Sequence, residues 1–185
     1  MDAYLAIASR RDERRYRPDP LSAEVVERIL DAGRLSGSAS NRQPWTFVIP
    51  TSRERLGRVA ETVFEPDNIH GAGLVVAVIV KGKGPVRFDA GRAAQNMLLA
   101  AWNAGVSSCP NGLGDAAALH EALELADDEE VAIVLSFGLP EKPRDVAARS
   151  AEEWSARANR KPLAELDRQL EGLVQRGGVS DTVRA

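Results

Sequence analysis

The sequence predicts an α+β protein built as a single domain with about four strands. Two runs rich in β-branched residues, LVVAVIV at 74–80 and VAIVLSF at 131–137, are typical of buried central strands. Segments with the apolar spacing of amphipathic helices precede and separate these runs. The 185 residues show no internal repeat, and a chain of this length can bury a core of its own.

The composition is that of an ordinary globular protein and argues against several classes of function. Hydrophobic residues make up 44% and charged residues 28% of the chain, and the net charge of −3 disfavours a generic nucleic-acid-binding protein. The single cysteine cannot form an internal disulfide. The N-terminus lacks the pattern of a signal peptide, and the longest apolar run is too short to span a bilayer. We therefore expect a cytoplasmic protein with neither nucleic acid nor membrane as a partner.

Start and stop signals divide the first half of the chain into helices and one strand. Residues 4–11 place apolar side chains on one face and predict a short helix that ends in a cluster of arginines. Ser22 and Ser52 stand where they can cap two further helices. Between these two helices, residues 46–49 predict a strand closed by Pro50.

The strongest helix signal follows the first central strand. The segment DAGRAAQNMLLAAWNAG is predicted to form a helix from Asp89, with Gly105 as its C-terminal stop. A brief strand at 106–109 should break at Pro110. Asp115 is then placed to cap another helix before the last strand.

The C-terminal part of the chain lacks a core of its own. After the last strand the sequence is polar and charged, with Trp154 and Leu163 as isolated apolar anchors. Residues 141–170 are too many for a loop, so we expect this arm to lie on another surface, which favours a dimer. The domain is predicted to span 1–170, with a dimerisation arm from about residue 141. Residues 171–185 are expected to be frayed.

No motif in the chain carries chemistry by itself. The arginines of SRRDERRYR favour a solvated face when taken alone, although guanidinium groups also match phosphate oxygens. The G-x-G pairs lack the rest of a dinucleotide fingerprint, KGKGP lacks the P-loop ending, and the two histidines lack metal-site spacing. Cys109 is better explained as a small buried hydrophobe than as a nucleophile. We predict neither a metal site nor a catalytic side chain, so an enzyme with this sequence needs a cofactor.

Taken together and in order, several segments resemble the FMN-dependent nitroreductase family. SRRDERRY is similar to the family's S-R-R-S-x-R-x-[FY] stretch, and GSASNRQPW to its P-S-x-x-N-x-Q-P-W loop. FDAGRAAQNMLLAAWNAGVSSCPNG resembles the family's central helix and flavin-facing turn, and GLPEKPR and NRKPLAEL resemble its closing elements. The resemblance extends to about residue 166. It implies a mixed sheet flanked by helices, assembled as an intertwined homodimer with two FMN molecules at the interface.

The resemblance also implies which residues bind FMN. The phosphate, the ribityl chain and the pyrimidine end of the ring would be contacted by Arg10, Arg11, Asp12 and Arg14, and the phosphate also by Arg160 with Lys161 from the arm. The flavin of the other subunit would be reached by Ser38, Ala39, Ser40 and Asn41. The ring near N5 would be bordered by Pro110, Asn111 and Gly112.

The implied activity is that of an NAD(P)H-dependent oxidoreductase, which passes hydride to FMN and then to a nitroaromatic, a quinone or a related acceptor. Asp12 stands where the family usually has serine and Gly37 where it usually has proline, and the chain is too short for the long active-site helices of larger members. Two alternatives stay open: a flavin-binding protein without turnover, and a relative that uses a deazaflavin or transforms the flavin. We expect Asp12 to pair with Arg11 or Arg15, or to accept a ribityl hydroxyl, rather than to face the phosphate.

Overall fold

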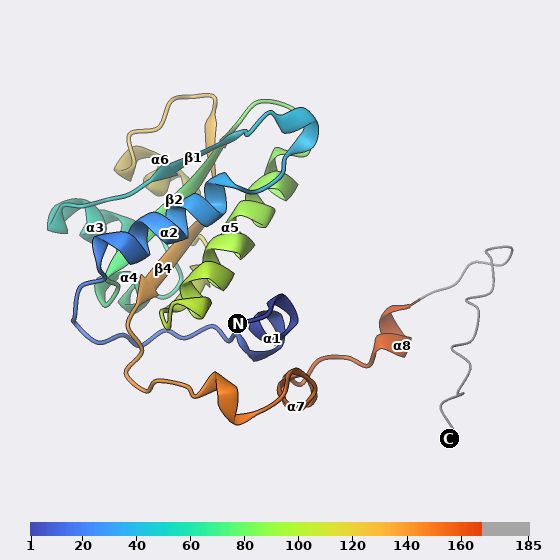
Figure 1. The fold of residues 1–185 in the computed structure, drawn as a ribbon. Coiled ribbons are helices and arrows are strands. Elements are labelled where there is room, and N and C mark those ends of the chain that lie inside the picture. The colour runs from blue at the N-terminus through green and yellow to red at the C-terminus, as the bar shows by residue number, and fades with distance from the viewer. Residues whose placement is uncertain (168–185) are drawn as a thin grey trace, which may run out of the picture.

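A four-stranded sheet lies at the centre of the computed structural model, which describes residues 1–167 (Figure 1). The strand order is β1-β2-β4-β3. The strands are β1 (Trp45–Val48), β2 (Leu74–Lys81), β3 (Ser107–Asn111) and β4 (Glu129–Gly138). The helices are α1 (Ala3–Ser9), α2 (Ala23–Arg34), α3 (Arg53–Ala60), α4 (Asp67–His70), α5 (Val86–Asn103), α6 (Ala116–Ala122), α7 (Ala151–Ala156) and α8 (Leu163–Leu166), with 3₁₀ turns η1 (Ala39–Asn41) and η2 (Val146–Ala148). The predicted α+β class is confirmed.

All three strand pairings of the described sheet are antiparallel. The parallel contribution that a mixed sheet implies is limited, within residues 1–167, to an isolated bridge between Asp12 and Ser108. None of the described helices is both long enough and apolar enough to cross a membrane. The tail predicted to fray, 171–185, lies outside the described residues.

Helices cover both faces of the sheet, which explains why β2 shows no polar alternation. Val76 and Val78 pack with α2 and α5 on one face, while Val75 and Ala77 pack with α3, α4 and α6 on the other. Every residue of β2 except its last is buried, as the LVVAVIV pattern predicted.

The predicted caps of three helices are confirmed. The side-chain oxygens of Ser22, Ser52 and Asp115 accept backbone N–H groups at 3.4, 3.1 and 2.9 Å, respectively. The predicted start at Asp89 is wrong, because α5 begins at Val86. Its cap position is held by a proline, whose fixed φ suits a helix start and whose missing N–H costs nothing there.

The region after α5 follows the prediction in one respect and departs from it in another. Gly105 adopts φ +74° directly after the helix, which is the left-handed stop that the sequence indicated. Pro110 does not end the following strand, since β3 continues to Asn111. A proline is tolerated here because β3 is an edge strand of the described sheet, where a missing N–H need not break the ladder.

Helix α5 runs along one face of the sheet and joins two distant parts of the chain (Figure 1). Near its C-terminal end, Trp102 Nε1 donates to Ser9 Oγ of α1 at 2.8 Å. Near its N-terminal end, the backbone N–H of Ala39 donates to Asp89 Oδ2 at 3.0 Å. The positions of Asp89 and Trp102 on a continuous helix place these two contacts about 20 Å apart along its axis.

The first part of the C-terminal arm finds a surface on its own chain. Trp154 of α7 is 4% exposed, and its Nε1 donates to the Val146 carbonyl at 3.0 Å. The guanidinium groups of Arg144 and Arg149 lie over its ring. Beyond α7 the chain reaches α8, where Leu163 is 73% exposed. The described residues therefore leave this later part of the arm uncovered.

Candidate functional site

The arginine-rich segment at residues 10–14 lies beside β3, the strand that leads into the residues predicted to border the FMN ring. Asp12 bridges to Ser108 of β3, and the N–H of the next residue, Glu13, donates to the Ser108 carbonyl at 3.1 Å. These backbone contacts dock residues 10–14 against β3. They bring the predicted phosphate-binding arginines to the same side of the sheet as residues 110–112.

Asp12 pairs with an arginine, as expected, but the partner is not Arg11 or Arg15. Arg10 Nη1 lies 2.7 Å from Asp12 Oδ1. The reason is the extended backbone, which places residues two apart on one side and neighbours on opposite sides. The pair is partly covered, with side-chain exposures of 16% for Arg10 and 38% for Asp12. The carboxylate is therefore charge-compensated by its neighbour within the chain.

Arg14 lies next to Cys109. Burial raises the pKa of the Cys109 thiol, and the nearby Arg14 guanidinium opposes that shift. The thiol is 1% exposed, in agreement with the prediction of a packing residue. Arg14 is itself exposed, so its guanidinium is available to a ligand at this surface.

Arg11 points away from this pair toward the arm. Its guanidinium donates to the carbonyls of Ala8 at 2.7 Å, Arg10 at 2.8 Å and Trp154 at 3.2 Å. Burial lowers the pKa of Arg11, and the nearby charges of Arg144, Arg160 and Arg10 add to that shift. In this chain Arg11 thus links α1 to α7, and it has Arg160 nearby. Arg160 and Lys161 are both exposed.

The three residues predicted to border the ring differ in what they offer to a ligand. The Asn111 side chain is buried and fully engaged: its Nδ2 donates to Ser136 Oγ at 3.1 Å, and its Oδ1 accepts from Asn68 Nδ2 at 2.9 Å. Only the backbone of Asn111 can therefore face a ring. Pro110 is partly exposed and Gly112 exposed, so the turn presents mostly main chain.

Phe64 is a neighbour of this turn that the sequence did not reveal. Its ring is 74% exposed, and its N–H donates to the Gly112 carbonyl at 3.1 Å. A Cβ on Gly112 would lie 2.9 Å from Phe64 Cδ2, so a side chain at position 112 would force the Phe64 ring to shift. Phe64 follows the end of α3, and its only sequence signal is an aromatic residue beyond the amphipathic stripe.

The predicted flavin loop forms a tight turn at the N-terminal end of α5. Ser38 Oγ accepts the N–H of Gln43 at 2.8 Å, and the Ser38 carbonyl accepts the N–H of Asn41 at 3.0 Å. Ser40, Asn41 and Gln43 have φ angles of +53°, +53° and +50°. Left-handed backbone of this kind is costly for non-glycine residues and persists only where surrounding contacts impose it.

The loop and the ring-bordering turn do not meet within one chain. The loop leads into edge strand β1, whereas residues 110–112 lie at the end of the opposite edge strand, β3. Three strand spacings separate the two edges, or about 14 Å across the sheet. The described chain therefore carries two separate groups of predicted FMN contacts, one at each end of α5.

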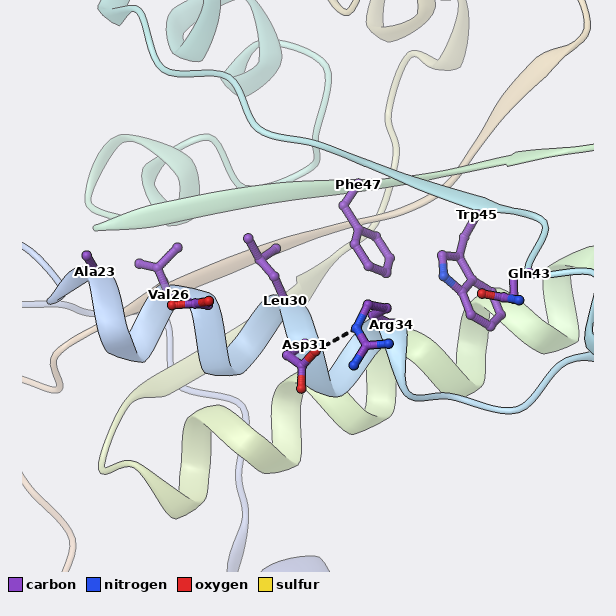
Figure 2. Close-up of a pocket in the computed structure, with 9 residues that line it drawn as sticks. Ala23, Val26, Leu30, Asp31, Arg34, Gln43, Trp45 and Phe47 are labelled. Atoms are coloured by element: carbon purple, nitrogen blue, oxygen red, sulfur yellow. Dashed lines mark hydrogen bonds and ion pairs between the residues drawn. The ribbon is translucent and has the colours of Figure 1, made fainter.

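A groove of about 710 Å³ lies between α2 and β1 (Figure 2). Val26, Leu30 and the rings of Trp45 and Phe47 form its apolar walls. An ion pair between Asp31 Oδ1 and Arg34 Nε, 2.6 Å apart, lies along it. The groove reaches the end of the loop at Gln43 but is not lined by the arginines predicted to bind FMN.

The three-layer α+β architecture is shared with solved nitroreductases. A nitroreductase family protein of Clostridium difficile superposes with a TM-score of 0.78 at 23% identity, covering 94% of this chain and 100% of that chain. A candidate nitroreductase of Desulfovibrio desulfuricans, solved in complex with FMN, superposes with a TM-score of 0.78 at 28% identity, covering 92% and 98%.

Sequence comparison leads to the same class. The model of the Nitroreductase family matches residues 7–81 and 67–139. An Archaeoglobus fulgidus protein named as a candidate NADH dehydrogenase/NAD(P)H nitroreductase is 32% identical over 149 residues, which cover 75% of this chain and 86% of that protein. The chain belongs to the nitroreductase family, and the resemblance noted in its sequence is confirmed.

Proposed function

We propose that this protein is an FMN-dependent NAD(P)H oxidoreductase that acts as a homodimer. One observation supports the proposal: in this nitroreductase-family chain the two sets of residues predicted to bind FMN lie at opposite edges of one sheet. A second copy that brings its loop to the arginine segment of the first would complete the site. When bound, FMN supplies the hydride chemistry, taking hydride from NAD(P)H and passing it to an acceptor such as a nitroaromatic or a quinone.

The residues near the C-terminal end of α5, which we call the arginine end, have the chemistry to bind FMN. Arg10 and Arg14 provide guanidinium donors suited to phosphate oxygens and to the electron-rich pyrimidine end of the ring. Ser108 Oγ is buried beside this segment and has no hydrogen-bond partner among the described residues. The turn at residues 110–112 presents mostly main chain, because the Asn111 side chain is turned inward, and such a surface suits the approach of a flat ring.

In this proposal each group has a separate task. Arg14 holds positive charge at the pyrimidine end, where negative charge develops during turnover. Arg10, oriented by Asp12, binds the phosphate end, together with Arg160 and Lys161 from the arm. Ser38, Ala39, Ser40 and Asn41 cover the ring from the other subunit and exclude water. No side-chain nucleophile is needed.

The first test is spectroscopic. Purified protein should carry the absorbance of bound FMN, which NADH or NADPH should bleach anaerobically, and a quinone or nitroaromatic should restore it with multiple turnovers. Bound FMN without turnover would instead support a carrier. Absence of FMN binding would overturn the proposal. FMN should also raise Tm, because a ligand that binds only the folded dimer stabilises it.

A mixing experiment tests whether two chains build each site. Arg14→Ala damages the arginine end and Asn41→Ala the loop end, so each pure variant has only damaged sites. In mixed dimers one site carries both changes and the other carries neither. Random reassociation should therefore restore about a quarter of the sites. Arg28→Ala, which removes an exposed arginine from α2, is the matched control and should be unimpaired. No recovery on mixing would show that each site lies within one chain.

A further inference from the structure

Side chains on one face of α5 contact the predicted flavin loop at residues 36–41. Asp89, Arg92 and Asn96 follow each other at helical spacing on the side that faces the loop. Asp89 Oδ2 accepts the N–H of Ala39 at 3.0 Å, and Asn96 Nδ2 donates to Ser36 Oγ at 2.7 Å. None of these three helix residues belongs to the set that the family resemblance implied.

Asp89 is an unusual residue to find at this place. It is 2% exposed, and an aspartate is rarely buried unless a partner compensates its charge. The loop N–H is one partner, and Arg92 Nη1 lies 3.9 Å from Oδ1. Its position in the first turn of an 18-residue helix places the carboxylate at the positive end of the helix dipole. The helix dipole therefore stabilises the buried charge of Asp89, and the carboxylate in turn fixes the loop through the N–H of Ala39.

Arg92 lies against Gly37. A Cβ built on Gly37 would lie 2.5 Å from Arg92 Nη2 and 3.1 Å from its Cζ. The guanidinium therefore occupies the space that a side chain at position 37 would fill. Residue 37 departs from the proline that is usual in the family, and Arg92 of α5 fills the space beside the glycine. This complementary pair argues against a merely degraded loop.

The loop needs such support because its own backbone is strained. Ser40, Asn41 and Gln43 all have positive φ angles, and each lies after the point where Ala39 is bound. Left-handed non-glycine residues are maintained by contacts that over-determine them. The contacts of Ser36, Gly37 and Ala39 with α5 fix the segment that enters this strained turn.

We propose that Asp89, Arg92 and Asn96 are positioning residues that set the loop at 36–41 in the geometry that meets the flavin of the other subunit. This inference rests on the proposed function. The three side chains act through the loop, without touching the ring themselves. Loss of any one should loosen the loop and weaken FMN binding while leaving the arginine end intact.

Amide hydrogen exchange tests the inference without FMN. In Asp89→Ala the amides of residues 38–43 should exchange at least about tenfold faster, because Ala39 loses its acceptor. Asp89→Asn keeps an acceptor oxygen and should retain most of the protection. Asp31→Ala, which removes an exposed carboxylate paired with Arg34, is the matched control. Asn96→Ala gives an independent reading if the buried Asp89→Ala variant fails to fold.

FMN affinity provides the second reading. Asp89→Ala should raise the Kd for FMN about tenfold, with Asp89→Asn close to the wild type. Unchanged exchange, or faster exchange with unchanged affinity, would overturn the inference. If the wild-type protein does not bind FMN, the proposed function fails, but exchange still decides whether α5 fixes the loop.

A double-mutant cycle tests the match between Gly37 and Arg92. Arg92 is a flexible side chain that is 47% exposed, so Gly37→Ala should displace it without unfolding the chain. Gly37→Ala and Arg92→Ala should then weaken FMN binding by a similar factor, about threefold, and the double variant should be no worse than either. Gly57→Ala on α3, where a Cβ meets nothing within 4 Å, is the control. Additive losses would show that the two positions act independently and would reject the matched pair.

Discussion

The two ends of α5 carry the two halves of the candidate site, and they are built in opposite ways. At the arginine end the backbone is fixed by the core: Asp12 bridges to β3, and the buried Tyr16 hydroxyl lies 3.0 Å from Ser136 Oγ. At the loop end the backbone is strained and is held by side chains of α5, among them Asp89. Where side chains are proposed to bind FMN, the core holds the backbone. Where the backbone itself is proposed to meet FMN, a few polar contacts from α5 hold it.

The largest effect should come from breaking the packing of the arginine end with Gly138→Ala. A Cβ at this position would lie 2.6 Å from Cγ and 2.7 Å from Cβ of the buried Tyr16, atoms that lie close to the backbone and cannot swing aside as the end of a flexible side chain can. We expect a loss of about 3 kcal/mol in the free energy of unfolding, measured by urea denaturation. Gly57→Ala, with open space around the new methyl group, should be neutral or slightly stabilising. A loss below about 1 kcal/mol would show that this end is as adaptable as the loop.

A smaller effect is expected at the side chains of the same end. Arg14→Ala should lower the two-electron potential of bound FMN by about 1–2 kcal/mol, or roughly 20–45 mV, because a cation beside the ring favours the more negative redox state. Arg10→Ala and Arg160→Ala should weaken FMN binding in both redox states alike and leave the potential nearly unchanged. The measurement is the potential of each FMN-saturated variant. Equal potentials in all three would make Arg14 another phosphate ligand or a surface charge.

Most of the fold could be predicted from local signals. The caps at Ser22, Ser52 and Asp115 and the buried strand at 74–80 were predicted correctly because each depends on neighbouring residues alone. The start of α5 was misplaced because Asp89 has the residue type of a cap, whereas its carboxylate is used in a tertiary contact with the loop. Local propensity cannot distinguish these two uses.

The candidate site was predictable only in part, for a similar reason. A family resemblance can identify Arg10 or Asn111 as site residues, but the direction of each side chain depends on its neighbours in space. Asn111 turns inward to Ser136, and Phe64 reaches Gly112 from a distant segment. The support that α5 gives to the loop is likewise invisible in sequence, since it joins residues 50 positions apart.

The smallest effect should come from Asp12→Ser, which removes the carboxylate that orients Arg10. Two consequences oppose each other: the site gains one positive charge, and Arg10 loses the partner that holds it 2.7 Å away. A partly exposed ion pair contributes about 0–1 kcal/mol, so we expect the Kd for FMN to change by less than about fivefold and not to tighten. Asp19→Ser, which breaks a comparable exposed pair with Arg17, serves as the matched control. Measuring Kd at low and high salt separates the two consequences, because only the gain in charge is screened. A tenfold tightening at low salt that disappears at high salt would mean that Asp12 faces the phosphate, and that Arg10 does not neutralise it in the complex.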